Sequence, residues 1–320
     1  MSDAIAMRHV TRTFTARRKA GRFRRTRTEV TAVDDLSFTV PAGEFVGYLG
    51  ANGAGKSTSI KLLTGVLAPT GGQVRVLGHD PFGQRSRTAH RIGTMSAQRI
   101  QLWWDLPLRD SFEQLRYIYR VGPAAYRQRL DELVDVLDLT ALLPVPVRQL
   151  SLGQRIRGEL AASVLHSPDV LFLDEPTIGL DVIAKQRIRD FLITLNREQG
   201  VTVLLTTHDM ADLERMCSRL LLLSQGRLIC DDSITRLFVA HGLERTLVVD
   251  LADEQPPLRV PGARVSKVEG PRQWLAFTSR SLPPDQLIVE ITKQARIVDL
   301  TINEPDVEDL VRALHETEHR

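Results

Sequence analysis

A glycine-rich loop constrains the fold of this chain more than any other feature of its sequence. The stretch GANGAGKST fits the pattern Gly50-x-x-x-x-Gly55-Lys56-Ser57, between an apolar run at 45–49 and a predicted helix that begins near Lys56. Glycines let backbone N–H groups turn toward phosphate oxygens, and a helix N-terminus adds partial positive charge. The lysine of such a loop reaches the outer phosphates, and the serine hydroxyl ligates Mg²⁺. The pattern predicts a nucleoside triphosphate site.

A second segment supplies two adjacent carboxylates. The apolar run 170–173 is followed directly by Asp174 and Glu175. A short apolar run without alternation is typical of a strand buried on both faces of a parallel sheet, and ligands bind at the ends of such strands. We expect Asp174 to hold Mg²⁺ through water and Glu175 to orient or deprotonate the attacking water. The alternative is a salt-bridged structural pair.

A histidine follows the next predicted buried strand. The apolar run 201–205 ends in Thr206, Thr207 and His208. A histidine in this place can hydrogen-bond a γ-phosphate and couple its presence to a shift of the loop. A lone histidine is more often a satisfied polar residue, but beside the other two motifs the functional interpretation is favoured.

Together these segments resemble the motifs of the nucleotide-binding subunit of an ATP-binding cassette (ABC) transporter, in the family's order from about residue 5 to residue 235. Residues 50–58 resemble the Walker A loop, Gln98 the Q-loop glutamine, 150–154 the signature motif, 170–175 Walker B with its catalytic glutamate, 179–181 the D-loop and His208 the switch histidine. The resemblance implies an α/β fold, a P-loop NTPase ABC ATPase domain at residues 1–240. Its parts are a RecA-like core, an antiparallel β subdomain and a helical subdomain at about 100–165.

The resemblance also implies ATP and Mg²⁺ as cofactors and a role for each matching position. The metal-binding residues are Ser57, Gln98 and Asp174, and the catalytic residues are Glu175, His208 and Gln98. The residues that contact nucleotide, in this subunit or across a dimer, are Phe14, Gly50, Asn52, Gly53, Ala54, Gly55, Lys56, Ser57, Thr58, Ser151, Gly153, Gln154 and Asp181. Phe14 is expected to stack on adenine, with Phe23 as the alternative.

The stretch RQLSLGQRIR, residues 148–157, predicts a second helix N-terminus, at Ser151 and Gly153. A helix N-terminus binds anions, and a triphosphate cradled by its own loop leaves a γ-phosphate face free. In the family that face is covered by the signature motif of a second copy, which implies a head-to-tail dimer that closes on two ATP molecules and reopens on hydrolysis. Three positions depart from the family pattern without removing a catalytic group: Ala51, Leu152 and Ile178.

Two tryptophans, Trp103 and Trp104, lie in the predicted helical subdomain. In transporters of the family this subdomain receives the membrane subunits, and exposed aromatic side chains suit a partner's groove. The other interpretation is core packing, because tryptophans are mostly buried.

The pattern changes after residue 240. Alternating segments at 245–251, 263–269, 273–279 and 296–302 predict strands, and 283–295 and 304–316 predict helices, so residues 241–320 are expected to form a small α+β domain. It resembles the C-terminal extension on ATPase subunits of two-component exporters, including viologen-type exporters. Structural support or dimer contact and substrate sensing both remain possible roles.

Charge and apolar patterning bear on partners and location. No apolar stretch approaches the roughly 18 to 20 residues needed to cross a bilayer, and no leader opens the chain, while the cysteines, Cys217 and Cys230, favour a reducing cytoplasm. The basic segment 17–27 suits anionic lipid or nucleic acid, or is a solvated hairpin tip.

These features favour the ATPase of an ABC exporter at the cytoplasmic face of the cell membrane, working as a dimer, most simply a homodimer, under two transmembrane permease subunits. The alternative is a soluble ABC-type ATPase that acts on nucleic acid or ribosomes. Relatives of that kind carry an inserted coiled coil or a second cassette, and this chain carries neither. We therefore expect no nucleic-acid partner.

Overall fold

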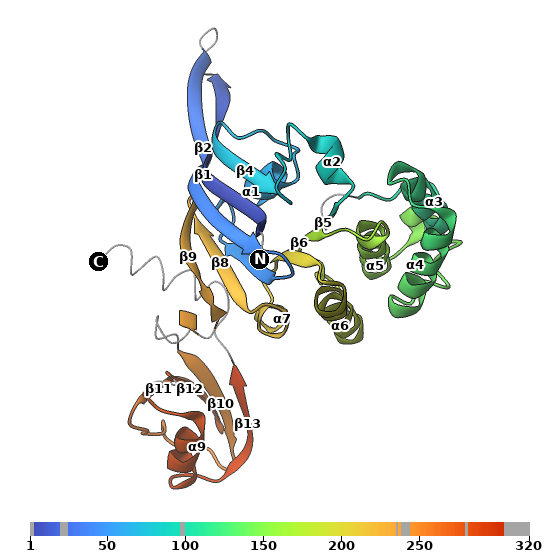
Figure 1. Cartoon of the computed structure of the whole chain (residues 1–320). Helices are drawn as coiled ribbons and strands as arrows, with labels where there is room; N and C mark the ends of the chain where they lie inside the picture. The colour runs from blue at the N-terminus through green and yellow to red at the C-terminus, as the bar shows by residue number, and fades with distance from the viewer. Residues whose placement is uncertain are drawn as a thin grey trace. The chain divides into compact units, whose positions relative to one another are not determined.

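The computed structural model describes residues 3–19, 25–96, 100–234, 236–237, 244–278 and 281–303 (Figure 1). Contacts divide the chain into two compact units, Met1–Asp231 and Asp232–Arg320. The domain boundary predicted after residue 240 lies outside the described residues, as does the helix predicted at 304–316.

The bounds of the elements follow the chain. The strands before the second unit's sheet are β1 (Asp3–Lys19), β2 (Arg25–Pro41), β3 (Phe45–Gly50), β4 (Gly71–Val76), β5 (Ile92–Ser96), β6 (Val170–Asp174), β7 (Thr202–Thr206), β8 (Arg219–Ser224) and β9 (Arg227–Ser233). The helices among them are α1 (Lys56–Leu63), α2 (Arg85–Ala89), α3 (Leu108–Ile118), α4 (Pro123–Val136), a 3₁₀ turn (Val147–Gln149), α5 (Leu152–Val164), α6 (Val182–Gln199) and α7 (Met210–Met216).

A six-stranded sheet in the order β5-β6-β7-β3-β8-β9 positions the site. Strand β3 pairs in parallel with β7 and β8, and β6 pairs in parallel with β5 and β7. The three apolar runs of the sequence form β3, β6 and β7, which confirms these strands, although β7 begins at Thr202. Because the carboxyl ends of parallel strands meet at one edge, the segments after β3, β6 and β7 converge there.

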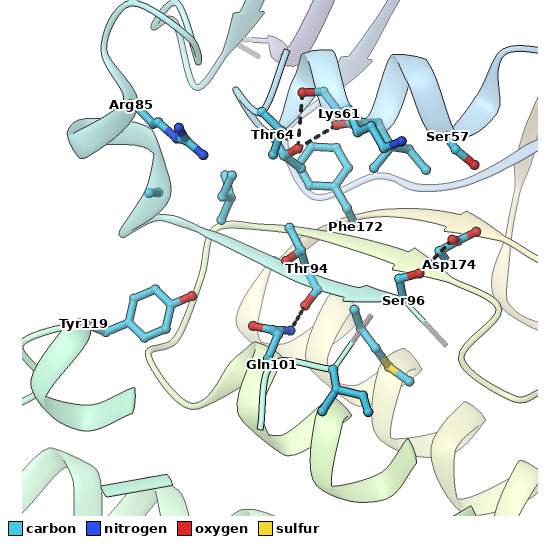
Figure 2. A pocket seen from close by; sticks show the side chains of 16 residues that line it. Ser57, Lys61, Thr64, Arg85, Thr94, Ser96, Gln101, Tyr119, Phe172 and Asp174 are labelled. Carbon is cyan, nitrogen blue, oxygen red and sulfur yellow. Dashed lines mark hydrogen bonds between the residues drawn. The ribbon is translucent and has the colours of Figure 1, made fainter. Parts of the chain in front are cut away.

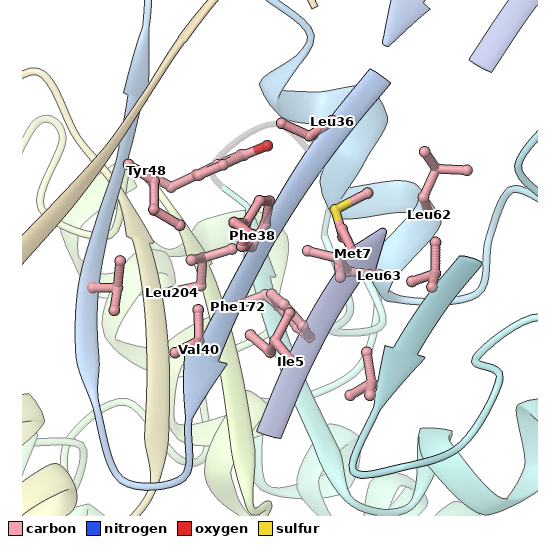
Figure 3. Packing of buried hydrophobic residues seen from close by; sticks show 14 of the residues in the cluster. Ile5, Met7, Leu36, Phe38, Val40, Tyr48, Leu62, Leu63, Phe172 and Leu204 are labelled. Atoms are coloured by element: carbon pink, nitrogen blue, oxygen red, sulfur yellow. The ribbon is translucent and has the colours of Figure 1, made fainter. Parts of the chain in front are cut away.

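A three-stranded sheet, β2-β1-β4, is antiparallel and packs on the first sheet. Figure 3 shows its apolar side chains, such as Ile5 and Phe38, meeting Phe172 and Leu204 of the parallel sheet and Leu62 of α1. The strands β1 and β2 continue as a two-stranded hairpin past the residues that β4 pairs, Ile5 to Thr11 (Figure 1). Residues 17–19 and 25–27 are paired toward the hairpin end, in agreement with the hairpin-tip interpretation of the basic segment.

Helices α3, α4 and α5 occupy the predicted helical subdomain. Helix α4 begins with proline at its first turn, where the missing N–H costs nothing. Helix α5 presents a nearly continuous buried surface from Gly158 to Val164, and its buried Glu159 accepts hydrogen bonds from the N–H groups of Gln101 and Leu102. This carboxylate ties the segment after the masked residues 97–99 to the helical subdomain.

The second unit is a four-stranded antiparallel sheet with one helix on it. The strands are β10 (Arg245–Leu251), β11 (Ala263–Glu269), β12 (Arg272–Phe277) and β13 (Ile297–Asn303), in the order β11-β12-β10-β13, and the helix is α9 (Pro284–Thr292). Alternating residues of β10, Leu247, Val249 and Leu251, pack with Leu287 and Ile291 of α9. The four strands and this helix confirm the α+β prediction for the described part of the unit.

Among the described residues no helix combines the length and apolar character needed to cross a bilayer. Cys217 is buried and Cys230 is half-buried, and neither forms a disulfide.

Candidate functional site

The loop after β3 needs glycine at two positions of its backbone. Gly50 and Gly55 have φ angles of 151° and 102°, and a Cβ on Gly55 would lie 2.5 Å from the Ala32 carbonyl oxygen. Helix α1 starts at Lys56 with no side chain capping its first amides. Its N-terminal N–H groups and partial positive charge are therefore available to an anion.

The loop closes one side of a cavity of about 230 Å³. It is lined by Ala32, by residues 51–58, and by Asp174, Glu175 and His208. The structure thus brings together the phosphate loop, both carboxylates and the histidine that the sequence placed on three separate segments. Ala32, from β2, was missed because nothing in its own sequence context marks it.

Lys56 lies inside this cavity rather than in solvent. Its Nζ donates hydrogen bonds to the carbonyl oxygens of Gly50 and of Ala51, the latter at 3.2 Å. Burial lowers the pKa of Lys56, while the negative charges of Asp174 and Glu175 oppose that shift. The ammonium is held by the loop's carbonyl groups at the position where an outer phosphate would meet it.

Two hydroxyl groups fix the carboxylate of Asp174. Thr206 Oγ1 donates to Asp174 Oδ1 at 2.6 Å, and Ser96 Oγ donates to Asp174 Oδ2 at 3.0 Å. These orienting residues lie at the ends of β7 and β5, and only the sheet order reveals them. Ser57 and Asp174 both line the cavity and supply oxygen ligands of the kind that Mg²⁺ prefers.

The donor set fits a cation that also binds substrate phosphates. Among the described residues no group of three or more His, Cys, Asp or Glu side chains suits a metal ion. Mg²⁺ usually takes one or two protein ligands and completes its shell with phosphate oxygens and water, so the pair Ser57 and Asp174 is compatible with it.

Glu175 and His208 form a pair at the mouth of the same cavity. His208 Nε2 lies 3.4 Å from Glu175 Oε1, and His208 is largely exposed. Glu175 has a φ of 55°, a strained value for a non-glycine residue, and its N–H donates to the Thr206 carbonyl at 3.0 Å. Burial raises the pKa of Glu175, and the charge of His208 opposes the rise.

The predicted signature segment begins α5 and contributes no residue to the lining of this cavity. Ser151 caps the helix: its Oγ accepts from the Gln154 N–H at 3.3 Å, and the Gln154 side chain accepts from the Ser151 N–H at 2.8 Å. This reciprocal pair is a capping box. The helix N-terminus at Gly153 therefore lies apart from the nucleotide loop of its own chain.

The signature segment interlocks with the D-loop of the same chain. A Cβ on Gly179 would lie 2.7 Å from Leu152 Cδ2, and a Cβ on Gly153 would lie 3.1 Å from Leu180 Cδ2. Each leucine thus sits over a glycine of the other segment. Asp181 then caps α6, accepting from the Ala184 N–H at 2.8 Å.

Other predicted residues lie elsewhere. Phe14, half-buried on β1, packs under the Arg12 guanidinium, 4.7 Å from the ring centroid, and does not line the cavity. Gln98 and Phe23 lie outside the described residues. Trp103 and Trp104 are 37% and 47% exposed, which favours the surface interpretation over core packing.

A second cavity of about 470 Å³ adjoins the first (Figure 2). Ser57 and Asp174 line both, and Lys61, Arg85 and Tyr119 line the far part of the second. Gln101 donates a hydrogen bond to the Thr94 carbonyl within it. Fold and site together define a P-loop nucleotide-binding protein.

Comparisons with known proteins agree with this class. The family described as ABC transporter matches residues 33–178. A Nod factor export ATP-binding protein of Ralstonia nicotianae is 34% identical over 83% of this chain and 82% of its own length. The uncharacterized ABC transporter ATP-binding protein YhcH of Bacillus subtilis is 37% identical over 62% of this chain, and the match spans 64% of that protein.

A solved structure gives the same result. A dimeric ATP-binding cassette in a post-hydrolysis state, bound to ADP and Pi, matches with a TM-score of 0.62 and 25% identity, over 72% of this chain and 98% of that one. This chain belongs to the family of ABC transporter ATP-binding proteins, which are ATPases.

Proposed function

We propose that this chain is the ATP-hydrolysing subunit of an ABC exporter, which dimerises around two ATP molecules and drives two separate transmembrane permease subunits. One observation carries the proposal: Lys56, Asp174, Glu175 and His208 share one cavity, while the helix N-terminus at Gly153 lies outside it. The loop binds the phosphates, Ser57 and Asp174 hold Mg²⁺, and Glu175 accepts a proton from the attacking water.

A second copy is the partner that completes the site. A bound triphosphate keeps a γ-phosphate face that its own loop does not cover, and the N-terminus of α5 is an anion-binding surface without an anion of its own chain. An apolar patch surrounds that surface. Its members, with their exposed fractions, are Leu152 (43%), Ile178 (48%), Val182 (82%) and Ile183 (70%). Such a cluster of exposed apolar side chains is typical of an interface.

Val182→Asp is expected to weaken the ATP-dependent dimer at least tenfold, because it places a charge in the proposed apolar contact. The association constant of the full chain with ATP, measured by sedimentation, checks this. Val289→Asp, on the exposed side of α9 at 53% exposure, is the matched control and is expected to leave dimerisation unchanged. Equal dimerisation by both variants would remove the patch from the interface.

The acid side of the pH profile of hydrolysis follows from Glu175. A general base must be ionised, and burial raises the pKa of Glu175, with His208 opposing. Activity is therefore lost as pH falls through a pKa above the usual 4.5 of glutamate. We expect the acid limb of kcat/KM to lie above that value, measured with ATP at saturating Mg²⁺. A limb at or below 4.5 would contradict the role of Glu175 as the base.

The permease subunits are proposed to dock on the helical subdomain, where Trp103 and Trp104 are exposed. This docking would hold the chain at the cytoplasmic face of the membrane. Relatives of the chain carry names of exporters and of an importer. Export is proposed because the α+β domain at 241–320, as the sequence delimits it, resembles the C-terminal extension of exporter ATPases.

The proposal is tested by purifying the tagged full chain from its native host in mild detergent, beside a Trp103→Ser, Trp104→Ser variant. We expect polytopic membrane proteins in fixed ratio with the unmodified chain and their loss from the variant, with ATP binding retained in both. Recovery with ribosomes or nucleic acid, and without a membrane protein, would overturn the transporter assignment.

A further inference from the structure

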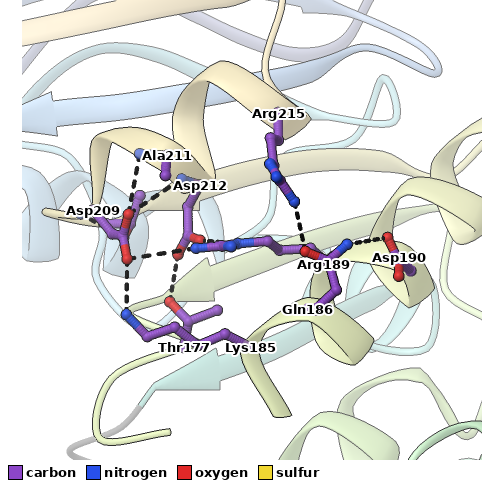
Figure 4. Close-up of polar contacts among 10 residues, drawn as sticks. Thr177, Lys185, Gln186, Arg189, Asp190, Asp209, Ala211, Asp212 and Arg215 are labelled. Carbon is purple, nitrogen blue, oxygen red and sulfur yellow. Dashed lines mark hydrogen bonds and ion pairs between the residues drawn. The ribbon is translucent and has the colours of Figure 1, made fainter. Parts of the chain in front are cut away.

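Five side chains form a polar cluster, which we call the α6–α7 cluster (Figure 4). They come from three segments that are separate in sequence: the turn after β6, helix α6, and the N-terminal turn of α7. The members are Thr177, Lys185, Arg189, Asp209 and Asp212.

The inner half of the cluster is a buried ion pair. Arg189 donates from Nε to Asp212 Oδ1, and the Thr177 hydroxyl donates to Asp212 Oδ2. The side chain of Asp212 has no exposed surface, and that of Arg189 is 10% exposed. A buried carboxylate with both oxygens bonded fixes α7 against α6, since loss of either bond leaves a polar group unpaired.

The outer half of the cluster holds Asp209. Its Oδ1 caps α7, accepting from the N–H groups of Ala211 at 3.0 Å and Asp212 at 3.4 Å. Its Oδ2 lies 2.8 Å from Lys185 Nζ and 3.5 Å from an Arg189 nitrogen. Burial alone raises the pKa of Asp209, but Lys185 and Arg189 lower it below its usual value. One carboxylate thus joins the start of α7 to two cations of α6.

Asp209 is also the residue next to His208, whose ring lies beside Glu175. We propose that Lys185 and Arg189 are positioning residues for ATP hydrolysis: by fixing Asp209, they hold the His208 ring beside Glu175 and at the edge of the phosphate-loop cavity. The inference rests on the proposed function. Neither cation lines that cavity, so both act through the backbone between residues 208 and 209.

The position of Lys185 on its helix gives the cluster a second connection. Lys185 lies within one turn of Val182 and Ile183, the most exposed members of the apolar patch. A second copy that docks on this patch would load the first turn of α6. The Lys185–Asp209 ion pair then passes that load to His208, so subunit contact and the geometry of the catalytic pair become coupled.

Lys185→Met is the variant that separates positioning from folding. It keeps the apolar stem of a side chain that is 28% exposed and removes the ammonium. We expect kcat of the full chain to fall about tenfold, the usual scale for loss of a group that orients a catalytic residue, with the Kd for ATP changed less than about twofold. Lys185→Arg keeps the charge and is expected to restore kcat.

The neighbouring residue provides a matched control. Gln186 accepts a hydrogen bond from Arg215 at 2.5 Å, which also joins α6 to α7 but does not touch Asp209 (Figure 4). Gln186→Ala is expected to leave kcat unchanged. If it lowers kcat as much as Lys185→Met, any contact between these helices suffices, and the assignment to Asp209 is wrong.

A spectroscopic measurement reads the position of His208 without hydrolysis. In the full chain with ¹³C-labelled histidine, the His208 signal is identified by its loss in His208→Gln. We expect Lys185→Met to shift this signal and Gln186→Ala to leave it in place. An unmoved signal with an unchanged kcat overturns the inference, whereas absence of ATP hydrolysis by the unmodified chain overturns the proposed function itself.

Discussion

Glu175→Gln is expected to slow ATP hydrolysis by about 10² to 10⁴-fold while leaving ATP binding intact, the usual effect of removing a positioned base. The amide keeps the shape of the side chain and its place beside His208, but it does not accept the proton of the attacking water. With hydrolysis blocked, the closed state persists, and an ATP-bound dimer is expected to accumulate. Single-turnover hydrolysis and light scattering of the full chain with ATP measure the two effects.

The control for this variant is another glutamate of the same unit. Glu198 is exposed near the end of α6, away from the phosphate-loop cavity. Glu198→Gln is expected to hydrolyse ATP at the unmodified rate. Should Glu175→Gln keep more than a tenth of the unmodified rate, another group accepts the proton. A variant that binds ATP and stays monomeric would weaken the proposal that two subunits enclose the nucleotides.

Lys56→Ala is expected to weaken ATP binding by about 100-fold. The ammonium lies in the phosphate-loop cavity on the carbonyl groups of Gly50 and Ala51, and a charge-assisted contact with phosphate contributes up to about 3 kcal/mol. Removing it leaves the backbone of the loop and the helix N-terminus as the remaining phosphate ligands. Titration of the full chain with a fluorescent ATP analogue measures the loss.

Lys61→Ala tests whether that loss is specific. Lys61 lies on the same helix, lines the second cavity and is absent from the lining of the first. Its removal makes the same change in net charge, so we expect ATP affinity close to that of the unmodified chain. Equal weakening by both variants would mean that general electrostatic attraction, rather than the contact at Lys56, holds the nucleotide.

The parts of the site that follow one another along the chain were predicted from sequence. The phosphate loop declares itself by glycine spacing, and the strands that end at Asp174 and Thr206 declare themselves as apolar runs followed by polar residues. The sheet order then determines that these ends meet. Residue type and local spacing suffice where a function needs a fixed backbone conformation.

Contacts between distant segments were not predictable in the same way. Nothing local to Ser96 marks it as a partner of Asp174, which follows 78 residues later. The α6–α7 cluster joins Thr177 to Asp212 across 35 residues, and each member alone resembles an ordinary surface or helix-capping residue. Such pairs arise from the register of the sheet and the packing of helices, which a single sequence does not encode locally.

The interlock of Leu152 with Gly179 has a consequence for how such sequences change. The leucine occupies the space that any side chain at 179 would need, and Gly179 has a φ of 69°, which favours glycine independently. A larger residue at 179 is therefore compatible only with a smaller one at 152. Across relatives these two positions are expected to vary as a pair, so that substitution at one records the substitution history of the other.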